Sequence, residues 1–305
     1  MTTPTPNARH KRLNRSATYA SVSVALTLMA AKFWAWSVTA SVSVLSSLVD
    51  STLDVLASAI TFAAVWYAVT PADGEHRFGH GKAEGLAALV QSLVISGSGL
   101  FVCYEAILRF AEPRPVQAIS TGFIVMVGSF LLTLALLAYQ RYVVQATGSV
   151  AIAADAMHYK TDVLVNLGVA LVLPLSVYTD LPILDPIAGL LIAGYILRGT
   201  WEIANKSLEI LLDREIADED RMRIREIAEA HPGVKGFHDL RTRSAGSVMF
   251  VQFHLELDPK LTLLATHQIL DDVENKVRAA YPDCDIIVHP DPLGLPEERD
   301  PFEVL

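Results

Sequence analysis

The sequence predicts a membrane protein with six transmembrane helices, followed by a small α+β cytoplasmic domain. Of the 305 residues, 52% are hydrophobic and 19% are charged, which is too apolar for a soluble protein of this size. The charges are also unevenly placed. Positions 17–70 hold only three of them, whereas the chain after position 212 is rich in charge; the three are Lys32, Asp50 and Asp54. We therefore expect a membrane domain in residues 1–212, a soluble domain in residues 213–291 and a C-terminal segment in residues 292–305.

Six apolar segments are close to the roughly 20 residues that a helix needs to cross a bilayer. Pro71 ends the second segment, because proline cannot continue the hydrogen-bond ladder, and Pro113 and Pro115 follow the third. The fourth contains no charged residue. The expected spans are residues 17–37, 44–69, 84–109, 116–140, 150–178 and 187–201, with a turn at 39–43 and room for the last span to continue to 212.

An even number of spans places both ends of the chain on the same side of the membrane, and basic residues in the loops indicate which side that is. One side holds only Arg109 and Arg114. The other side holds many more, namely Arg9, Lys11, Arg12, Arg15, Arg77, Lys82, Arg141, Arg198 and Lys206. Both termini should therefore lie in the cytoplasm.

The expected order of elements in the soluble domain is αββαβ, which gives one small sheet covered by helices. Helices are expected at 218–230 and 261–281, and strands at 237–243, 248–257 and 285–289. Strand 248–257 alternates, so that Val251, Phe253 and Leu255 face one side and His254 lies on the more polar side. In the second helix the expected buried stripe is Leu263, Leu270, Val273 and Val277.

Two short stretches inside the apolar segments carry ionisable residues four positions apart. Asp50 and Asp54 form one pair, and His158 and Asp162 form the other. Residues at i and i+4 share one face of a helix. Because charged groups inside a membrane are costly, such pairs usually mark a transport pathway or a site. Together they would supply three carboxylates and one imidazole, which suits a tetrahedral site for zinc or a similar divalent metal. A single pair could instead join helices by hydrogen bonds.

Two other groups of residues could hold a metal. In the loop after the second span, Asp73, His76 and His80 are spaced three and four apart, although a solvated polar loop would look the same. The soluble domain carries candidate ligands on several of its elements, which could meet at one end or edge of its sheet as one site or as two that share a carboxylate; these are His238, His254, His267, His289 and Asp291. Scattered surface histidines are the alternative. The only cysteines are Cys103 and Cys284, so metal ligands must come from histidine and carboxylate.

These stretches resemble the cation diffusion facilitator family, in particular its bacterial exporters of divalent metals. The resemblance rests on residues 48–54 (LVDSTLD), 78–84 (FGHGKAE), 155–162 (DAMHYKTD) and 211–214 (LLDR), and in the soluble domain on residues 238–243 (HDLRTR) and 289–291 (HPD). It covers nearly the whole chain. Two positions beside proposed ligands depart from the family pattern, namely Gly74 in the loop and Pro290 between His289 and Asp291.

The resemblance implies a homodimer in the bacterial cytoplasmic membrane that exports Zn²⁺ and related ions, such as Cd²⁺ and Fe²⁺, by alternating access in exchange for inward-moving protons. The resemblance makes Asp50, Asp54, His158 and Asp162 the transport site. The loop residues Asp73, His76 and His80 would form a second site, and the soluble domain, which would be metallochaperone-like, would hold a regulatory zinc site. Lys82 and Asp213 match a charge pair near the dimer interface. No basic cluster suggests nucleic acid as a partner. The alternatives are a membrane-anchored metal sensor and a membrane metalloenzyme, but no His-Glu-x-x-His motif supports an enzyme.

Overall fold

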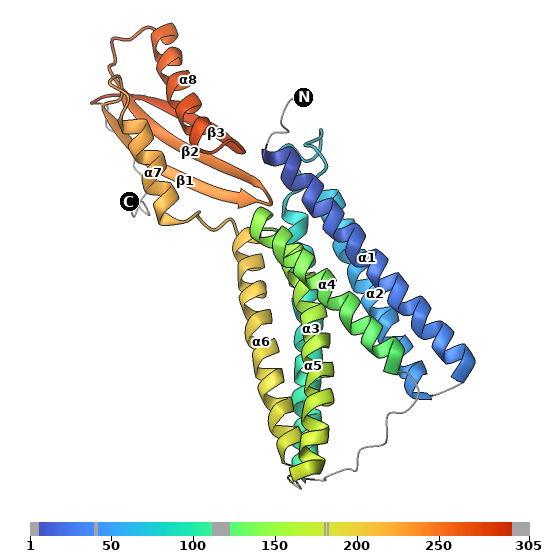
Figure 1. Cartoon of the computed structure of the whole chain (residues 1–305). Coiled ribbons are helices and arrows are strands. Elements are labelled where there is room, and N and C mark those ends of the chain that lie inside the picture. The colour runs from blue at the N-terminus through green and yellow to red at the C-terminus, as the bar shows by residue number, and fades with distance from the viewer. Residues whose placement is uncertain (1–5, 40–41, 112–122, 180, 182, 295–305) are drawn as a thin grey trace. The chain divides into compact units, whose positions relative to one another are not determined.

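The structure is a computed structural model that describes residues 6–39, 42–111, 123–179, 181 and 183–294. The chain divides into two compact units. One is residues 10–208; the other is residues 209–305 together with the first nine residues. Figure 1 labels the elements of both units.

Six long helices run through the first unit. They are α1 (Pro6–Thr39), α2 (Val42–Ala68), α3 (Lys82–Ala111), α4 (Phe123–Thr147), α5 (Val150–Thr179) and α6 (Leu184–Leu211). Within the described residues, α1, α2, α3 and α6 are long and apolar enough to cross a membrane by length and composition. The other two, α4 and α5, have 25 and 30 residues and so also exceed the roughly 20 that a bilayer requires.

One predicted span is displaced along the sequence. We expected the fourth span at 116–140, but α4 runs from Phe123 to Thr147, and the expected start at residue 116 lies outside the described residues. The prediction ended the helix where charge appears, at Arg141. Charge does not stop a helix, however, and α4 continues until Gly148, whose φ of 67° lies in the left-handed region that glycine adopts at little cost.

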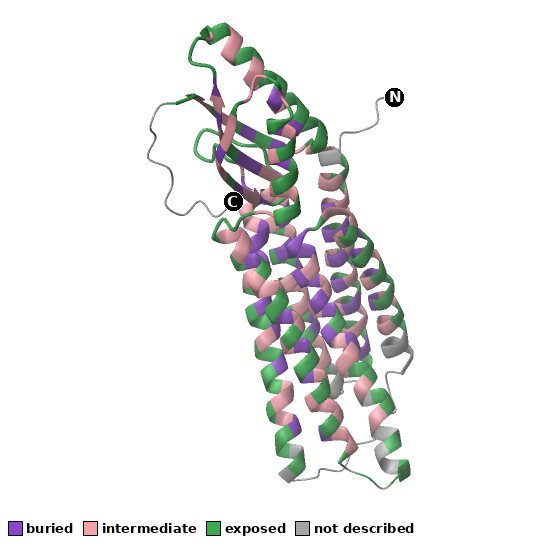
Figure 2. Cartoon of the chain, turned by 90° about the vertical axis from the view of Figure 1, so that its left-hand side faces the viewer, coloured by how far each residue is buried: buried purple, intermediate pink, exposed green. Residues whose placement is uncertain are grey.

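The helices of the first unit pack through a polar interior. Helix α5 contacts α2, α3 and α4, and α2 also contacts α3. Buried polar side chains lie between the helices, and Ser21 adds one from α1; they include Ser21, Ser58, Thr61, Gln91, Gln140 and Asp155. Figure 2 shows that buried residues gather toward the half of the unit that contains the start of α1 and of α5. This is the pattern of a bundle in lipid, where small and polar residues join helices and apolar residues face outward.

The second unit is a three-stranded sheet covered by two helices. Its elements are α7 (Asp218–Glu229), β1 (Gly236–Ala245), β2 (Val248–Leu257), α8 (Leu263–Ala280) and β3 (Cys284–Pro292). The strand order is β1-β2-β3, with β1 and β2 antiparallel and β2 and β3 parallel. The expected order αββαβ is therefore confirmed.

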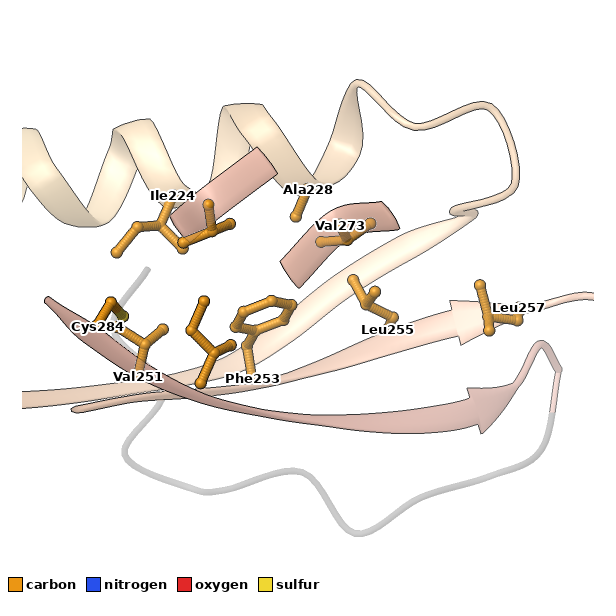
Figure 3. Close-up of a cluster of buried hydrophobic side chains, with 10 residues drawn as sticks. Ile224, Ala228, Val251, Phe253, Leu255, Leu257, Val273 and Cys284 are labelled. Atoms are coloured by element: carbon orange, nitrogen blue, oxygen red, sulfur yellow. The ribbon is translucent and has the colours of Figure 1, made fainter. Parts of the chain in front are cut away.

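The core of this unit lies between the sheet and its two helices. Val251, Phe253, Leu255 and Leu257 of β2 are buried there, as predicted from their alternation, and Figure 3 shows them facing α7 and α8. On α8 the expected stripe is only partly correct. Val273 and Val277 are buried and Leu270 packs against them, but Leu263 is 85% exposed. No residue in the first two turns of α8 is buried, so the stripe begins only further along the helix.

A bulge in β1 decides which side chains share a face of the sheet. His238 pairs with His254 and Arg241 with Gln252, so Asp239 and Leu240 together oppose one residue of β2. Asp239 has a φ of 49° at this irregularity. Without the extra residue, Asp239 rather than His238 would lie opposite His254. The bulge therefore places two histidines side by side.

Candidate metal centres

The first candidate centre joins α2 and α5. Asp54 of α2 faces His158 of α5, with 3.0 Å between Asp54 Oδ1 and His158 Nε2. Asp162 lies one turn further along α5, and its Oδ2 is 4.0 Å from the same ring nitrogen. One ligand atom from each of the three residues lies within 4.8 Å of the others. All three side chains are only partly exposed. Two carboxylates and an imidazole can hold one divalent cation at these spacings.

Asp50 lies one turn before Asp54 on α2, but it is exposed and does not belong to this cluster. The structure thus brings together three of the four residues expected from sequence. The pairing also fixes the offset between the two helices. Asp54 lies fourteen residues before the end of α2, whereas His158 lies eight residues after the start of α5. At 1.5 Å per residue, α2 extends about 9 Å further than α5 on that side of the cluster.

A buried carboxylate lies one turn from this cluster. Asp155 of α5 is 1% exposed and accepts hydrogen bonds from Ser21 of α1 at 2.5 Å, Gln140 of α4 at 2.7 Å and Ser58 of α2 at 3.4 Å. Tyr159 is within 2.9 Å of the Ser58 hydroxyl. Four helices therefore meet at one carboxylate. The i, i+4 spacing rule did not select Asp155, although an acidic residue in an apolar segment was the available signal.

The second candidate centre is the loop between α2 and α3. His80 Nε2 is 3.4 Å from Asp73 Oδ2, and His76 Nδ1 is 3.4 Å from Asp73 Oδ1. His80 is buried, whereas Asp73 and His76 are exposed. The structure therefore brings together all three residues expected from sequence. The other ring nitrogen of His80, Nδ1, is 3.4 Å from the carbonyl oxygen of Thr70. Because a carbonyl can only accept, this contact places the proton on Nδ1 and leaves Nε2 available as a ligand.

Asp73 organises the loop around itself. Its Oδ1 accepts hydrogen bonds from the backbone N–H of His76 at 2.7 Å and of Glu75 at 2.9 Å. The bond from His76 is the main reason that the pKa of Asp73 is lowered from its usual value. The carboxylate is therefore ready to bind a cation at neutral pH.

The third candidate centre lies on the face of the sheet opposite the core. Asp291 of β3 joins three histidines: its Oδ2 is 2.8 Å from His254 Nδ1 and 3.4 Å from His238 Nε2, and its Oδ1 is 3.2 Å from His289 Nε2. His238 pairs with His254 across β1 and β2, and His254 pairs with His289 across β2 and β3. Imidazole and carboxylate are suitable ligands for zinc, so the donors present fit that metal.

Two acidic residues not selected from sequence lie beside this centre. Asp239, at the bulge, groups with His238 and His254, and Glu256 Oε1 is 3.7 Å from His238 Nδ1. Only the bulge brings Asp239 there, so strand alternation could not have found it. His267, which was selected, is on α8 with its Nε2 3.5 Å from Asp271, and it is not a member of the clusters formed by described residues.

The proposed charge pair falls on two different units. Lys82 begins α3, whereas Asp213 follows α6 with a φ of 56° and lies 3.3 Å from Arg243. A contact between Lys82 and Asp213 therefore stays a prediction.

Comparison with known proteins gives the family. Residues 18–212 match the model of the cation efflux transmembrane domain, and residues 216–293 match that of the cation efflux protein cytoplasmic domain. The chain is 45% identical to the cation-efflux pump FieF of Shewanella oneidensis over 279 residues, covering 92% of this chain and 94% of the relative. It is 42% identical to FieF of Klebsiella pneumoniae over 289 residues, covering 95% and 96%.

Two solved structures similar to this chain each cover about a quarter of it. The metal-bound C-terminal domain of the CzcD transporter from Thermotoga maritima is 25% identical, covers 26% of this chain and 93% of that chain, and has a TM-score of 0.25. CzrB in its Zn form is 27% identical, covers 28% and 99%, and has a TM-score of 0.27.

The predicted fold class, a helical membrane domain followed by an α+β domain, is confirmed by both family models and by the order of elements. The metalloenzyme alternative is excluded, because a cation-efflux pump is 45% identical to this chain over 92% of its length. The chain belongs to the cation efflux family, the cation diffusion facilitators, as a multi-pass cation-efflux transporter with a cytoplasmic C-terminal domain, and it is not an enzyme.

Proposed function

We propose that this protein exports Zn²⁺ and related divalent cations, such as Cd²⁺ and Fe²⁺, from the cytoplasm in exchange for protons. The observation that carries the proposal is the meeting of Asp54, near the middle of α2, with His158 and Asp162 in the first half of α5, which packs against α2. These are side chains that a membrane protein rarely keeps away from water without a functional reason. The similarity to FieF cation-efflux pumps also supports the export of cations.

Asp50 is the proposed fourth ligand of the transport site. It lies on the turn of α2 before Asp54, so a change in its rotamer or a small movement of α2 would complete a set of three carboxylates and one imidazole. An imidazole among the ligands favours zinc or cadmium over magnesium or calcium.

Proton exchange follows from the chemistry of these ligands. A carboxylate or imidazole binds a metal through a lone pair that a proton can also occupy, so metal loading releases protons and protonation releases metal. Alternating exposure of the site to the two sides of the membrane, by rocking of helices, would couple the two flows.

The decisive experiment is metal-driven proton exchange in proteoliposomes. Asp54→Ala and Asp162→Ala should each abolish exchange, because each removes a ligand from the cluster. The matched control is Glu105→Ala, which removes a carboxylate of α3 that belongs to none of the clusters among the described residues. Normal exchange in both site variants would refute the transport site. Retained metal-dependent dimerisation without any exchange in the unmodified protein would favour a sensor.

The remaining expectations belong to the same proposal. We infer a homodimer in a bacterial cytoplasmic membrane from the match to the family's cytoplasmic domain and from the bacterial relatives. We place both termini in the cytoplasm, because the loops on the inner side carry most of the basic residues. The loop centre would capture metal near the membrane surface. The sheet centre would bind regulatory zinc and stabilise the dimer, and His267, which lies outside this cluster, stays an expected ligand of the domain. The Lys82–Asp213 pair would act near the dimer interface.

A further inference from the structure

Lys32 is a positive charge inside the first transmembrane helix. It lies seven residues before the end of α1, and no other basic residue occurs between positions 17 and 70. Its Nζ donates hydrogen bonds to Ser51 Oγ at 2.6 Å and to the carbonyl oxygen of Ser47 at 3.3 Å. Both acceptors belong to α2, the helix that carries Asp54.

The direction of this side chain is informative. A lysine about 10 Å from the end of a membrane helix can extend its four-carbon stem toward the headgroups, which avoids the desolvation of its charge. Lys32 instead turns across to α2, where two oxygen atoms accept from its ammonium. The charge is therefore held inside the bundle.

The place where it is held is next to the transport site. Ser51 follows Asp50 directly and lies one turn before Asp54 on the same face of α2. Ser51 is fully buried. A cation bound among these residues would therefore experience the field of Lys32.

Charge balance indicates what that field does. Three carboxylates around a divalent ion and a neutral imidazole leave one excess negative charge in a medium of low dielectric constant, which would hold the ion strongly. The ammonium of Lys32 cancels that excess. A transporter needs this correction, because an ion must be bound firmly enough to enter a site and weakly enough to leave it.

We propose that Lys32, held by its hydrogen bonds to Ser51 and Ser47, repels the divalent cation bound at the neighbouring site and thereby sets the rate at which the metal is released. This inference rests on the proposed function, since it takes Asp50, Asp54, His158 and Asp162 as the cation site. Lys32 contacts α2 rather than the ion, so it acts through its charge and is not itself a ligand.

The experiment measures how fast the full-length protein releases Cd²⁺. The reference protein carries His80→Ala, His254→Ala and Asp291→Ala, so that the loop and sheet centres no longer bind. It is loaded with Cd²⁺ in detergent and mixed with excess fluorescent chelator in a stopped-flow instrument. Lys32→Met, which keeps the length of the side chain without its charge, should slow release by about tenfold or more. Lys32→Arg should keep the reference rate. In proteoliposomes Lys32→Met should lower KM and maximal rate together.

Two controls separate this proposal from its alternatives. Lys160 lies on α5 between His158 and Asp162 in sequence, but its Nζ turns to Tyr195 of α6, so Lys160→Met should release Cd²⁺ at the reference rate. Asp54→Ala should bind no Cd²⁺ at this site, whereas Lys32→Met should bind Cd²⁺ and release it more slowly. Loss of binding in Asp54→Ala therefore tests the proposed function separately from the role of Lys32. Melting without metal identifies variants that fail to fold, and Lys32→Gln then replaces Lys32→Met. Release from folded Lys32→Met or Lys32→Gln as fast as from the reference would overturn the proposal.

Discussion

Asp155 illustrates how a single residue can hold a membrane domain together. Its carboxylate is buried and accepts hydrogen bonds from side chains of α1, α2 and α4. A buried donor that loses its acceptor is costly, and the amide of Gln140 has Asp155 as its acceptor, whereas Ser21 and Ser58 also contact each other. The residue lies three positions before His158, which ties this junction to the helix that carries the cation cluster.

Replacing Asp155 should therefore weaken the helical unit. Asp155→Ala leaves the amide of Gln140 without its acceptor, and we expect a loss of about 1–3 kcal/mol in unfolding free energy. Thermal unfolding of the purified protein in detergent measures this loss. Asp155→Asn keeps an acceptor oxygen of similar size and should lose less. Equal melting temperatures for Asp155→Ala and the unmodified protein would show that the junction contributes nothing.

The two helices of the cytoplasmic domain are joined by a tyrosine at the end of α8. The hydroxyl of Tyr281 donates a hydrogen bond to Asp220 Oδ1 of α7 at 2.9 Å. Burial, and then this bond to the carboxylate, raise the pKa of Tyr281 to about 12 from a usual 10.0. The fold thus favours the protonated hydroxyl over the phenolate.

This pKa predicts a dependence of stability on alkaline pH. A group whose pKa is higher in the folded state stabilises the fold below the unfolded pKa and loses that contribution as pH rises through the folded pKa. The stabilisation from Tyr281 should therefore be complete below pH 10 and disappear by about pH 12. Denaturant unfolding of the cytoplasmic domain between pH 9 and 12 measures it. Tyr281→Phe should be less stable at pH 9, and its curve should approach that of the unmodified domain as pH rises; parallel curves would contradict the assignment.

The three strands of the sheet together build the cytoplasmic metal centre. His238, His254 and His289 come from β1, β2 and β3 and meet at Asp291. A ligand that binds only the folded domain stabilises it, by about 2.7 kcal/mol at one hundred times its Kd. Zinc should therefore raise the melting temperature of a fragment with residues 213–294, and His254→Ala should lose most of that rise.

A matched histidine in the same domain provides the control. His231 Nε2 lies 3.7 Å from Asp272 and is not part of the metal clusters among the described residues. His231→Ala should therefore keep the zinc-dependent rise. An unchanged response to zinc in His254→Ala would argue against a metal centre on this face of the sheet.

At the scale of the whole molecule, the sequence was sufficient for the fold class because each signal was local. Apolar length predicted the helices, Pro71 marked the end of the second, and alternation in residues 248–257 predicted both faces of β2. The i, i+4 spacing likewise selected Asp54, His158 and Asp162 before their helices were placed together. What local signals missed depends on contacts distant in sequence. The offset of α2 against α5, the junction at Asp155 and the bulge at Asp239 each arise from how elements pack.

The bulge in β1 and the register of β3 have a consequence for how the cytoplasmic domain matures. A slip of one residue in either strand would turn its histidine to the apolar side of the sheet, out of reach of His254. Zinc binding would then select for the correct strand register, because only the correctly aligned sheet brings the ligands together. A domain with misaligned strands would gain no stability from the metal until its strands realigned.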